Sequence, residues 1–108
     1  MKPRVFKLEP TILDSSKSDR FGETVLVFPR HRYPSIASQA FQDEILERLL
    51  TLGFDPTRDY VLIGGPTVAL ALFVSAVAVN YGHYNALVFD PRDHVRDYEA
   101  VPVNGVAV

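Results

Sequence analysis

The order of apolar and polar positions along the chain predicts strands that alternate with helices. Residues 24–28 (TVLVF) form an unbroken β-branched and aromatic run, which is typical of a strand covered on both faces. From residue 38 to 52 the apolar positions recur at helical spacing, with charged residues on the opposite side. The later predicted elements are a strand at 60–63, a helix at 67–81, a strand at 85–89 and an alternating edge strand at 98–101.

This order predicts one α/β domain for the whole chain of 108 residues. We expect a small Rossmann-like fold of two or three layers, βαβαββ, with a mainly parallel sheet and a C-terminal antiparallel edge strand. Residues 1–23 read as an irregular N-terminal segment, with a short edge strand at 4–8 and a loop at 14–23. Residues 104–108 read as a frayed tail.

Two strand orders fit this pattern. If strand 24–28 lies between the other two parallel strands, the two helices lie on opposite faces of the sheet. If strand 60–63 lies in the middle, the helices share one face, and the other face is left to the N-terminal segment or to a partner.

The stretch from Tyr60 to Gly82 contains no charged side chain, so it is either a membrane span or buried core. Gly64, Gly65 and Pro66 divide it, and the helical part after them is only about 20 Å long. That is short of the roughly 30 Å hydrocarbon layer of a bilayer. We therefore predict a buried strand, turn and helix, and no membrane partner.

The helix predicted at 67–81 has no polar face. One apolar arc, centred on Phe73 and Val77, is expected on the sheet, which leaves a second arc and a strip of small residues to be covered. Either the N-terminal segment or a second copy of the chain could cover them. We predict a homo-oligomer, most simply a two-fold dimer. Its expected interface comprises Val68, Ala71, Leu72, Ser75, Ala78 and Val79.

Ligands of open parallel sheets bind at the carboxyl ends of the strands. Three loops are expected there, at 29–33, 64–67 and 90–94, and two arginines and a histidine face a glycine-rich helix start. The sequence predicts a site for an anion, such as a phosphate-bearing small molecule or nucleotide. Its expected residues are Arg30, His31, Arg32, Gly64, Gly65, Thr67 and Asp90.

Charge and composition narrow the function classes. A net charge of −2 argues against a strongly basic nucleic-acid binder, and the lack of cysteine excludes thiol catalysis. We expect a soluble, cytoplasmic, non-enzymatic protein with no cofactor and no metal. One alternative is an enzyme acting on a phosphoester, with His31 or His94 as acid or base. Another is an interaction protein with no small ligand.

Residues 59–103 also carry a resemblance. The strand at 60–63, the GGP turn, the alanine-rich helix, ALVFD and the closing YEAVPV resemble short uncharacterised α/β proteins of tailed bacteriophages and prophages. The resemblance implies a mobile-element origin, hence a host cytoplasm, and no particular mechanism. The architecture is also similar to small Rossmann-like domains that bind nucleotides, including those that sense cyclic oligonucleotides.

Overall fold

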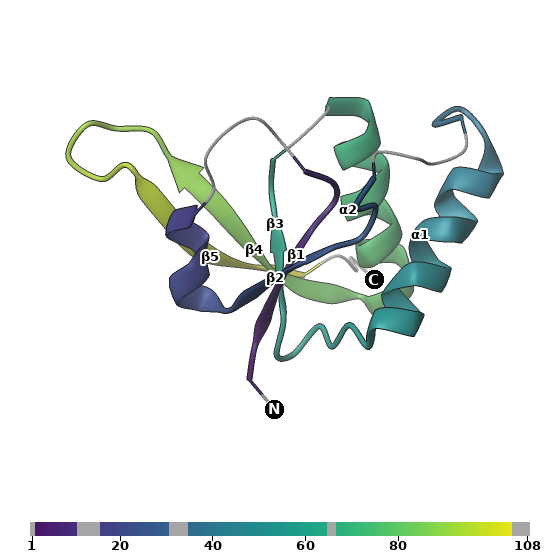
Figure 1. Cartoon of the computed structure of the whole chain (residues 1–108), viewed down its shortest axis with the longest axis horizontal. Coiled ribbons are helices and arrows are strands. Elements are labelled where there is room, and N and C mark those ends of the chain that lie inside the picture. Colours follow the sequence, from purple (N-terminus) through teal and green to yellow (C-terminus); the bar gives the residue numbers. More distant parts are fainter. Residues whose placement is uncertain (1, 11–15, 31–34, 65–66, 105–108) are drawn as a thin grey trace.

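A five-stranded sheet forms the centre of the protein, in the strand order β2-β1-β3-β4-β5 (Figure 1). The computed structural model describes residues 2–10, 16–30, 35–64 and 67–104. The first four strands in spatial order are parallel, and the last is antiparallel to its neighbour. The strands are β1 (Arg4–Lys7), β2 (Glu23–Leu26), β3 (Tyr60–Leu62), β4 (His83–Asp90) and β5 (Asp97–Asn104). The predicted α/β fold with an antiparallel C-terminal edge strand is confirmed.

β1 corrects the expected position of the N-terminal segment. It lies inside the sheet, paired on one side with β2 and on the other with β3, and is not an edge strand. Its pairing with β2 continues beyond the end of that strand. The Val27 amide donates to the Lys7 carbonyl and the Phe28 amide to the Leu8 carbonyl, each at 2.9 Å. Strand 60–63 does lie between the other two predicted parallel strands, but β1 is inserted between it and β2.

The sheet is covered differently on its two faces. Helices α1 (Gln39–Leu52) and α2 (Thr67–Tyr81) pack together on one face, and the short 3-10 helix η1 (Ser16–Phe21) lies on the other (Figure 1). The larger apolar cluster, which includes Phe6 and Phe73, lies under the two α-helices. A smaller cluster, which includes Val5 and Tyr98, has Phe21 of η1 packed against it. Residues 16–21, in the segment predicted as a loop, therefore form a short helix that covers part of the second face.

The direction of the chain across the sheet explains this division. The connection from β1 to β2 runs one way and carries η1, whereas the path from β2 through β3 to β4 runs the other way and carries α1 and α2. Because parallel crossovers share one hand, reversing the direction moves the connecting helix to the opposite face.

Local sequence signals fix the helix ends. α1 ends at Gly53, whose φ of 73° is left-handed, as predicted for a glycine that terminates a helix. The next residue, Phe54, donates its amide to the Leu49 carbonyl at 3.0 Å. Its ring packs edge-on against Phe6 and Tyr81, with centroids 5.0 and 5.1 Å away, so the end of α1 is tied to β1 and α2.

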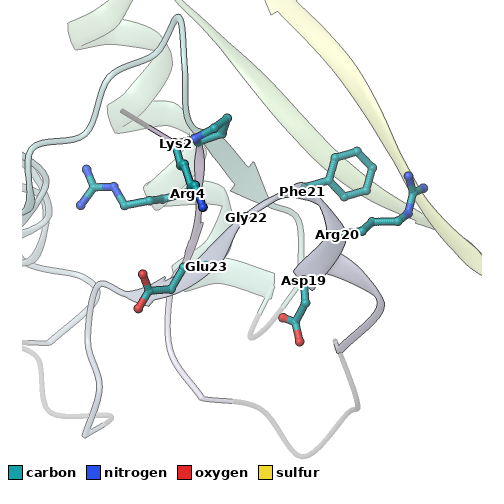
Figure 2. Close-up of a pocket in the computed structure, with 8 residues that line it drawn as sticks. Lys2, Arg4, Asp19, Arg20, Phe21, Gly22 and Glu23 are labelled. Carbon is teal, nitrogen blue, oxygen red and sulfur yellow. The ribbon is translucent and has the colours of Figure 1, made fainter.

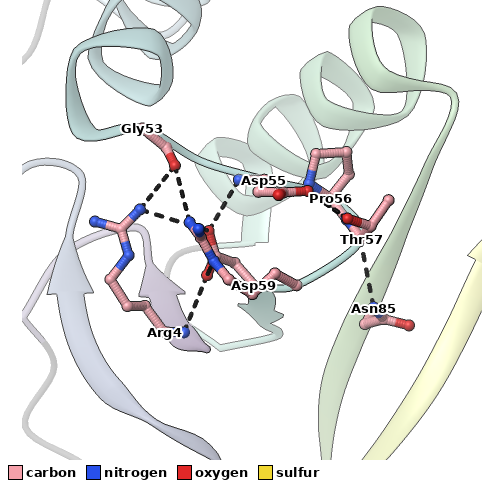
Figure 3. Close-up of polar contacts among 8 residues, drawn as sticks. Arg4, Gly53, Asp55, Pro56, Thr57, Asp59 and Asn85 are labelled. Carbon is pink, nitrogen blue, oxygen red and sulfur yellow. Dashed lines mark hydrogen bonds and ion pairs between the residues drawn. The ribbon is translucent and has the colours of Figure 1, made fainter. Parts of the chain in front are cut away.

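A buried carboxylate joins the turn before β3 to the start of β1 at the amino edge of the sheet (Figure 3). Asp59 accepts hydrogen bonds from the backbone amides of Arg4 at 3.0 Å and Asp55 at 2.9 Å. The guanidinium of Arg58 donates to both of its oxygens at 2.9 Å. Burial by itself raises the pKa of Asp59, but these donors outweigh it and lower the pKa below the usual aspartate value.

Candidate functional site

The carboxyl edge of the parallel strands is the region where such sheets bind ligands. The chain leaves β1 toward one side of the sheet and β3 toward the other, so these two neighbours form its topological switch point. Two charged residues, Lys7 and Glu9, are buried at or just after the end of β1. Both have interaction partners within the protein. Sequence reasoning missed them, because the charges interleaved in this segment were taken to limit any regular element.

The strand order spaces out the ends of the strands that precede the three expected loops. β1 separates β2 from β3, so the ends of those two strands are two strand spacings, or about 10 Å, apart. Asp90 is farther away still. Leu87 is the last residue of β4 that pairs with β3, and three more residues of strand add about 10 Å.

Asp90 lies on a projecting arm, and its carboxylate already binds Arg92. Beyond Leu87, β4 and β5 pair only with each other in the register of the sheet and extend as a two-stranded hairpin, visible at the left of Figure 1. The Asp90 carboxylate accepts from the Arg92 amide at 3.0 Å and from its Nε at 2.9 Å. The Arg92 side chain lowers the pKa of Asp90 through these bonds. His94 is exposed in the loop of this hairpin.

Arg30 has a neighbour that the sequence did not reveal. It is exposed after the end of β2 and lines a hollow of about 330 Å³ together with Phe28, Pro29 and Arg48. Arg48 comes from α1 and donates to the Val27 carbonyl at 3.0 Å, with its guanidinium 4.6 Å from the centre of the Phe28 ring. In the sequence, Arg48 lies on the charged side of the predicted helix and was interpreted as a solvent-exposed side chain. No sequence signal indicated that it would lie near Arg30.

Arg48 also has an acidic partner. Its guanidinium donates to the Glu44 carboxylate at 3.0 Å, one helical turn earlier. The hollow thus presents one arginine held by a carboxylate and a carbonyl, and Arg30, whose side chain is exposed. Two guanidinium groups at one hollow are suited to an anion with several oxygens.

The other predicted ligand residues lie elsewhere or outside the described residues. Gly64 is half-buried just after β3, and Thr67 is exposed as the first residue of α2. His31, Arg32 and Gly65 lie outside the described residues. Within the described ranges, no group of three or more His, Asp or Glu side chains is placed to hold a metal ion.

A second hollow, of about 380 Å³, lies at the opposite edge, between the start of β1 and the end of η1 (Figure 2). In Figure 2 the Arg20 side chain points to the opposite side from those of Arg4 and Glu23. Arg4 donates to the Gly53 carbonyl at 2.8 Å, and Arg20 donates to the Tyr98 carbonyl at 2.9 Å. Because both arginines are used to hold neighbouring segments, this hollow is a weaker ligand site than the one beside Arg30.

Four of the six predicted interface residues are exposed on α2, as far as the described residues show. α2 buries Ala69, Phe73, Ala76 and Val77. Val68 and Val79 remain 59% and 77% exposed. Ala71 and Ser75 are also exposed, and Leu72 and Ala78 are half-buried. The N-terminal segment does not cover this face in its described part, because that part lies in the sheet or on its opposite face.

Comparisons with protein-family models, with curated proteins and with solved structures found no match for this chain. The resemblance to phage proteins therefore stays a prediction. In the part of the chain that the structure describes, no helix is both long and apolar enough to cross a membrane.

Proposed function

We propose that the protein is a two-fold dimer, built on the exposed face of α2, that acts by binding and not by catalysis. The observation that carries the dimer is the exposure of Val79 and Val68, at 77% and 59%, on a helix without a charged residue. Isolated exposed apolar side chains are ordinary, but a whole apolar helix face is typical of an interaction site.

The neighbouring helix provides an internal comparison. α1 lies in the same layer and exposes Asp43 and Glu47 on its outer side, as a solvated helix should. It exposes one large apolar residue, Leu50. The difference between the two helices supports a partner for α2 in particular.

The dimer is tested by measuring the mass of the protein in solution at micromolar concentration, by light scattering or sedimentation. We expect twice the chain mass of 12.1 kDa. Val79→Glu should give a folded monomer, because the new carboxylates would be buried without partners at the interface. Leu50→Glu, a matched change on α1, should leave the dimer intact. A monomer for the unchanged protein would overturn the proposal.

A second function is favoured by the hollow between Arg30 and Arg48. We propose that it binds an anionic ligand that carries phosphate, with Arg30 as the ligand-binding side chain. Arg48 already supports β2 through the Val27 carbonyl and positions the hollow. The buried residues Lys7 and Glu9, at the end of β1, lie one strand away from this hollow and closer to the switch point of the sheet.

The ligand site is tested by thermal shift with inorganic phosphate, mononucleotides and cyclic nucleotides. We expect at least one of these to raise the melting temperature of the unchanged protein. Arg30→Gln should abolish the shift, and Arg96→Gln, on the distant hairpin, should preserve it. If none of these compounds gives a shift, the anion proposal is wrong. The protein would then act on a host or phage partner through its surface alone.

A further inference from the structure

Two helices are too few to cover one face of five strands. Strands lie about 4.8 Å apart and packed helices about 10 Å apart, so two helices cover about four strands. In this protein α1 and α2 share a face, and α2 packs against β4. The fifth strand in spatial order is β5, at the edge. Its Val101 is 41% exposed, and Val88 of β4 is 40% exposed.

These two valines lie on the same face as the helices. In the register of the hairpin, Val101 is opposite Ala86 and Val103 is opposite Tyr84. Ala86 and Tyr84 belong to the apolar cluster under the helices, and Val103 packs against it. Side chains two residues apart on a strand share a face, so Val88 joins the same side. We call Val88, Val101 and Val103 the β5 floor.

α2 forms a wall beside this floor. At helical spacing, Val68, Leu72 and Val79 lie along one side of the helix. The other side carries Tyr81, which lines a groove with Leu46 and Leu50 of α1. Because α1 lies on that other side, the side with Val68 and Val79 faces β5. The β5 floor and this wall form an apolar corner, uncharged except for Glu99 opposite Val88.

We propose that α2 of a second copy occupies this corner, so that each α2 packs against its partner's α2 and lies on its partner's β5 floor. The inference rests on the dimer proposed above and specifies its geometry. A two-fold axis makes the contact reciprocal, and the four helices then form one layer between two sheets. Each α2 would be enclosed by its own sheet, α1, the partner's α2 and the partner's β5, which accounts for the lack of charge all around it.

The area of the contact favours this arrangement over a contact between the two helices alone. A helix of 15 residues is about 22 Å long, and a face about 10 Å wide gives roughly 220 Å² for each copy. Two such faces total about 450 Å², well under the roughly 1,000 Å² of a specific interface. In the corner, a second face of each α2 lies on the partner's β5 floor and adds roughly another 220 Å² for each copy, so that together with the floor itself the total reaches about 1,000 Å².

The absence of cysteine from the chain allows a direct test by disulfide cross-linking. Val101→Cys protein would be mixed with Val68→Cys or Val79→Cys protein under mild oxidation. We expect a cross-linked heterodimer with at least one of the two. Leu50→Cys, on α1, should give none with Val101→Cys. Ser75→Cys, on the outer face of α2, is tested alone, because a cross-link between two Ser75→Cys chains marks a different dimer in which the outer faces of the two α2 helices meet.

The outcomes separate this inference from the dimer on which it rests. Cross-linking through Ser75→Cys alone would show a dimer whose α2 does not reach β5, and it would overturn the inference while leaving the dimer. A protein that is monomeric throughout would overturn both. Val101→Glu provides an independent measurement. It should raise the dissociation constant of the dimer about tenfold or more, while the circular dichroism spectrum stays that of the folded protein. An unchanged dissociation constant would contradict the β5 floor.

The experiments would also detect a different occupant of the β5 floor. Residues 105–108 follow β5 in the chain, and a third protein is another possible occupant. If Val101→Cys resists a thiol reagent while the protein is monomeric, the chain covers its own floor and the inference is wrong. If it reacts at the same rate in the monomer and the dimer, the second copy does not lie there.

Discussion

Asp59 ties the turn before β3 to the start of β1 at the amino edge of the sheet. Its carboxylate is fully buried and binds the start of β1, the turn at Asp55 and the Arg58 side chain (Figure 3). Removing one member of a buried, hydrogen-bonded ion pair leaves charge and donors without partners, at a typical cost of about 3–5 kcal/mol. Arg4 is 55 residues away from Asp59 in sequence, so this carboxylate acts as a long-range constraint between β1 and the turn before β3.

We predict that Asp59→Asn lowers the free energy of unfolding at pH 7 by about 3 kcal/mol. The pKa of Asp59 is lowered in the folded protein, so its contribution is complete above the ordinary aspartate pKa of 3.8 and is lost as the pH falls through the lowered value. The difference between the variant and the unchanged protein should therefore shrink at acidic pH. Urea denaturation at several pH values measures it, with the fully exposed Asp93→Asn as the control. A difference independent of pH would contradict the assignment.

At the scale of elements, the β4–β5 hairpin depends on η1. Lys17 donates to the Arg96 carbonyl at 2.5 Å. Arg20 binds the Asp97 carboxylate at 3.1 Å and the Tyr98 carbonyl at 2.9 Å. These contacts reach the part of the hairpin that has no third strand beside it. The arm is therefore held from one side by a helix of six residues.

We predict that Arg20→Ala increases amide hydrogen exchange in residues 88–99 and changes global stability by less than about 1 kcal/mol. The ion pair is largely exposed, and such pairs contribute little to overall stability. Exchange measured by mass spectrometry tests this. Arg92→Ala, which removes contacts only within the hairpin loop, should have a smaller effect on the strands. Equal protection in both variants would show that η1 does not hold the arm.

The elements that sequence reasoning found are those fixed by local signals. The bounds of α2 follow from its composition and from the glycines and proline before it, and the end of α1 follows from Gly53. β1 was assigned wrongly to an edge because Lys7 and Glu9 interrupt its apolar pattern, and their burial depends on neighbouring segments. The hollow beside Arg30 was found only in part, because Arg48 approaches from a helix whose packing the sequence does not specify.

At the scale of the whole molecule, the proposed dimer makes stability depend on concentration. Mass action favours the associated, folded state, by about 2.7 kcal/mol for a hundredfold rise in concentration. We predict that the melting temperature of the unchanged protein rises by several degrees over that range, and that the melting temperature of Val79→Glu does not. Calorimetry at two concentrations decides this. A melting temperature independent of concentration in both proteins would contradict a dimer that dissociates on unfolding.

The interior position of β1 has a consequence for the newly made chain. β1 leaves the ribosome before the other strands of the sheet, but its second partner, β3, ends at Leu62. At about 5–20 residues per second, those intervening residues take roughly 3–11 s to be made. During that interval one side of β1, with its apolar Val5 and Phe6, has no strand to pair with and is open to other nascent chains. Faster synthesis of this region should shorten the exposure and raise the yield of folded protein.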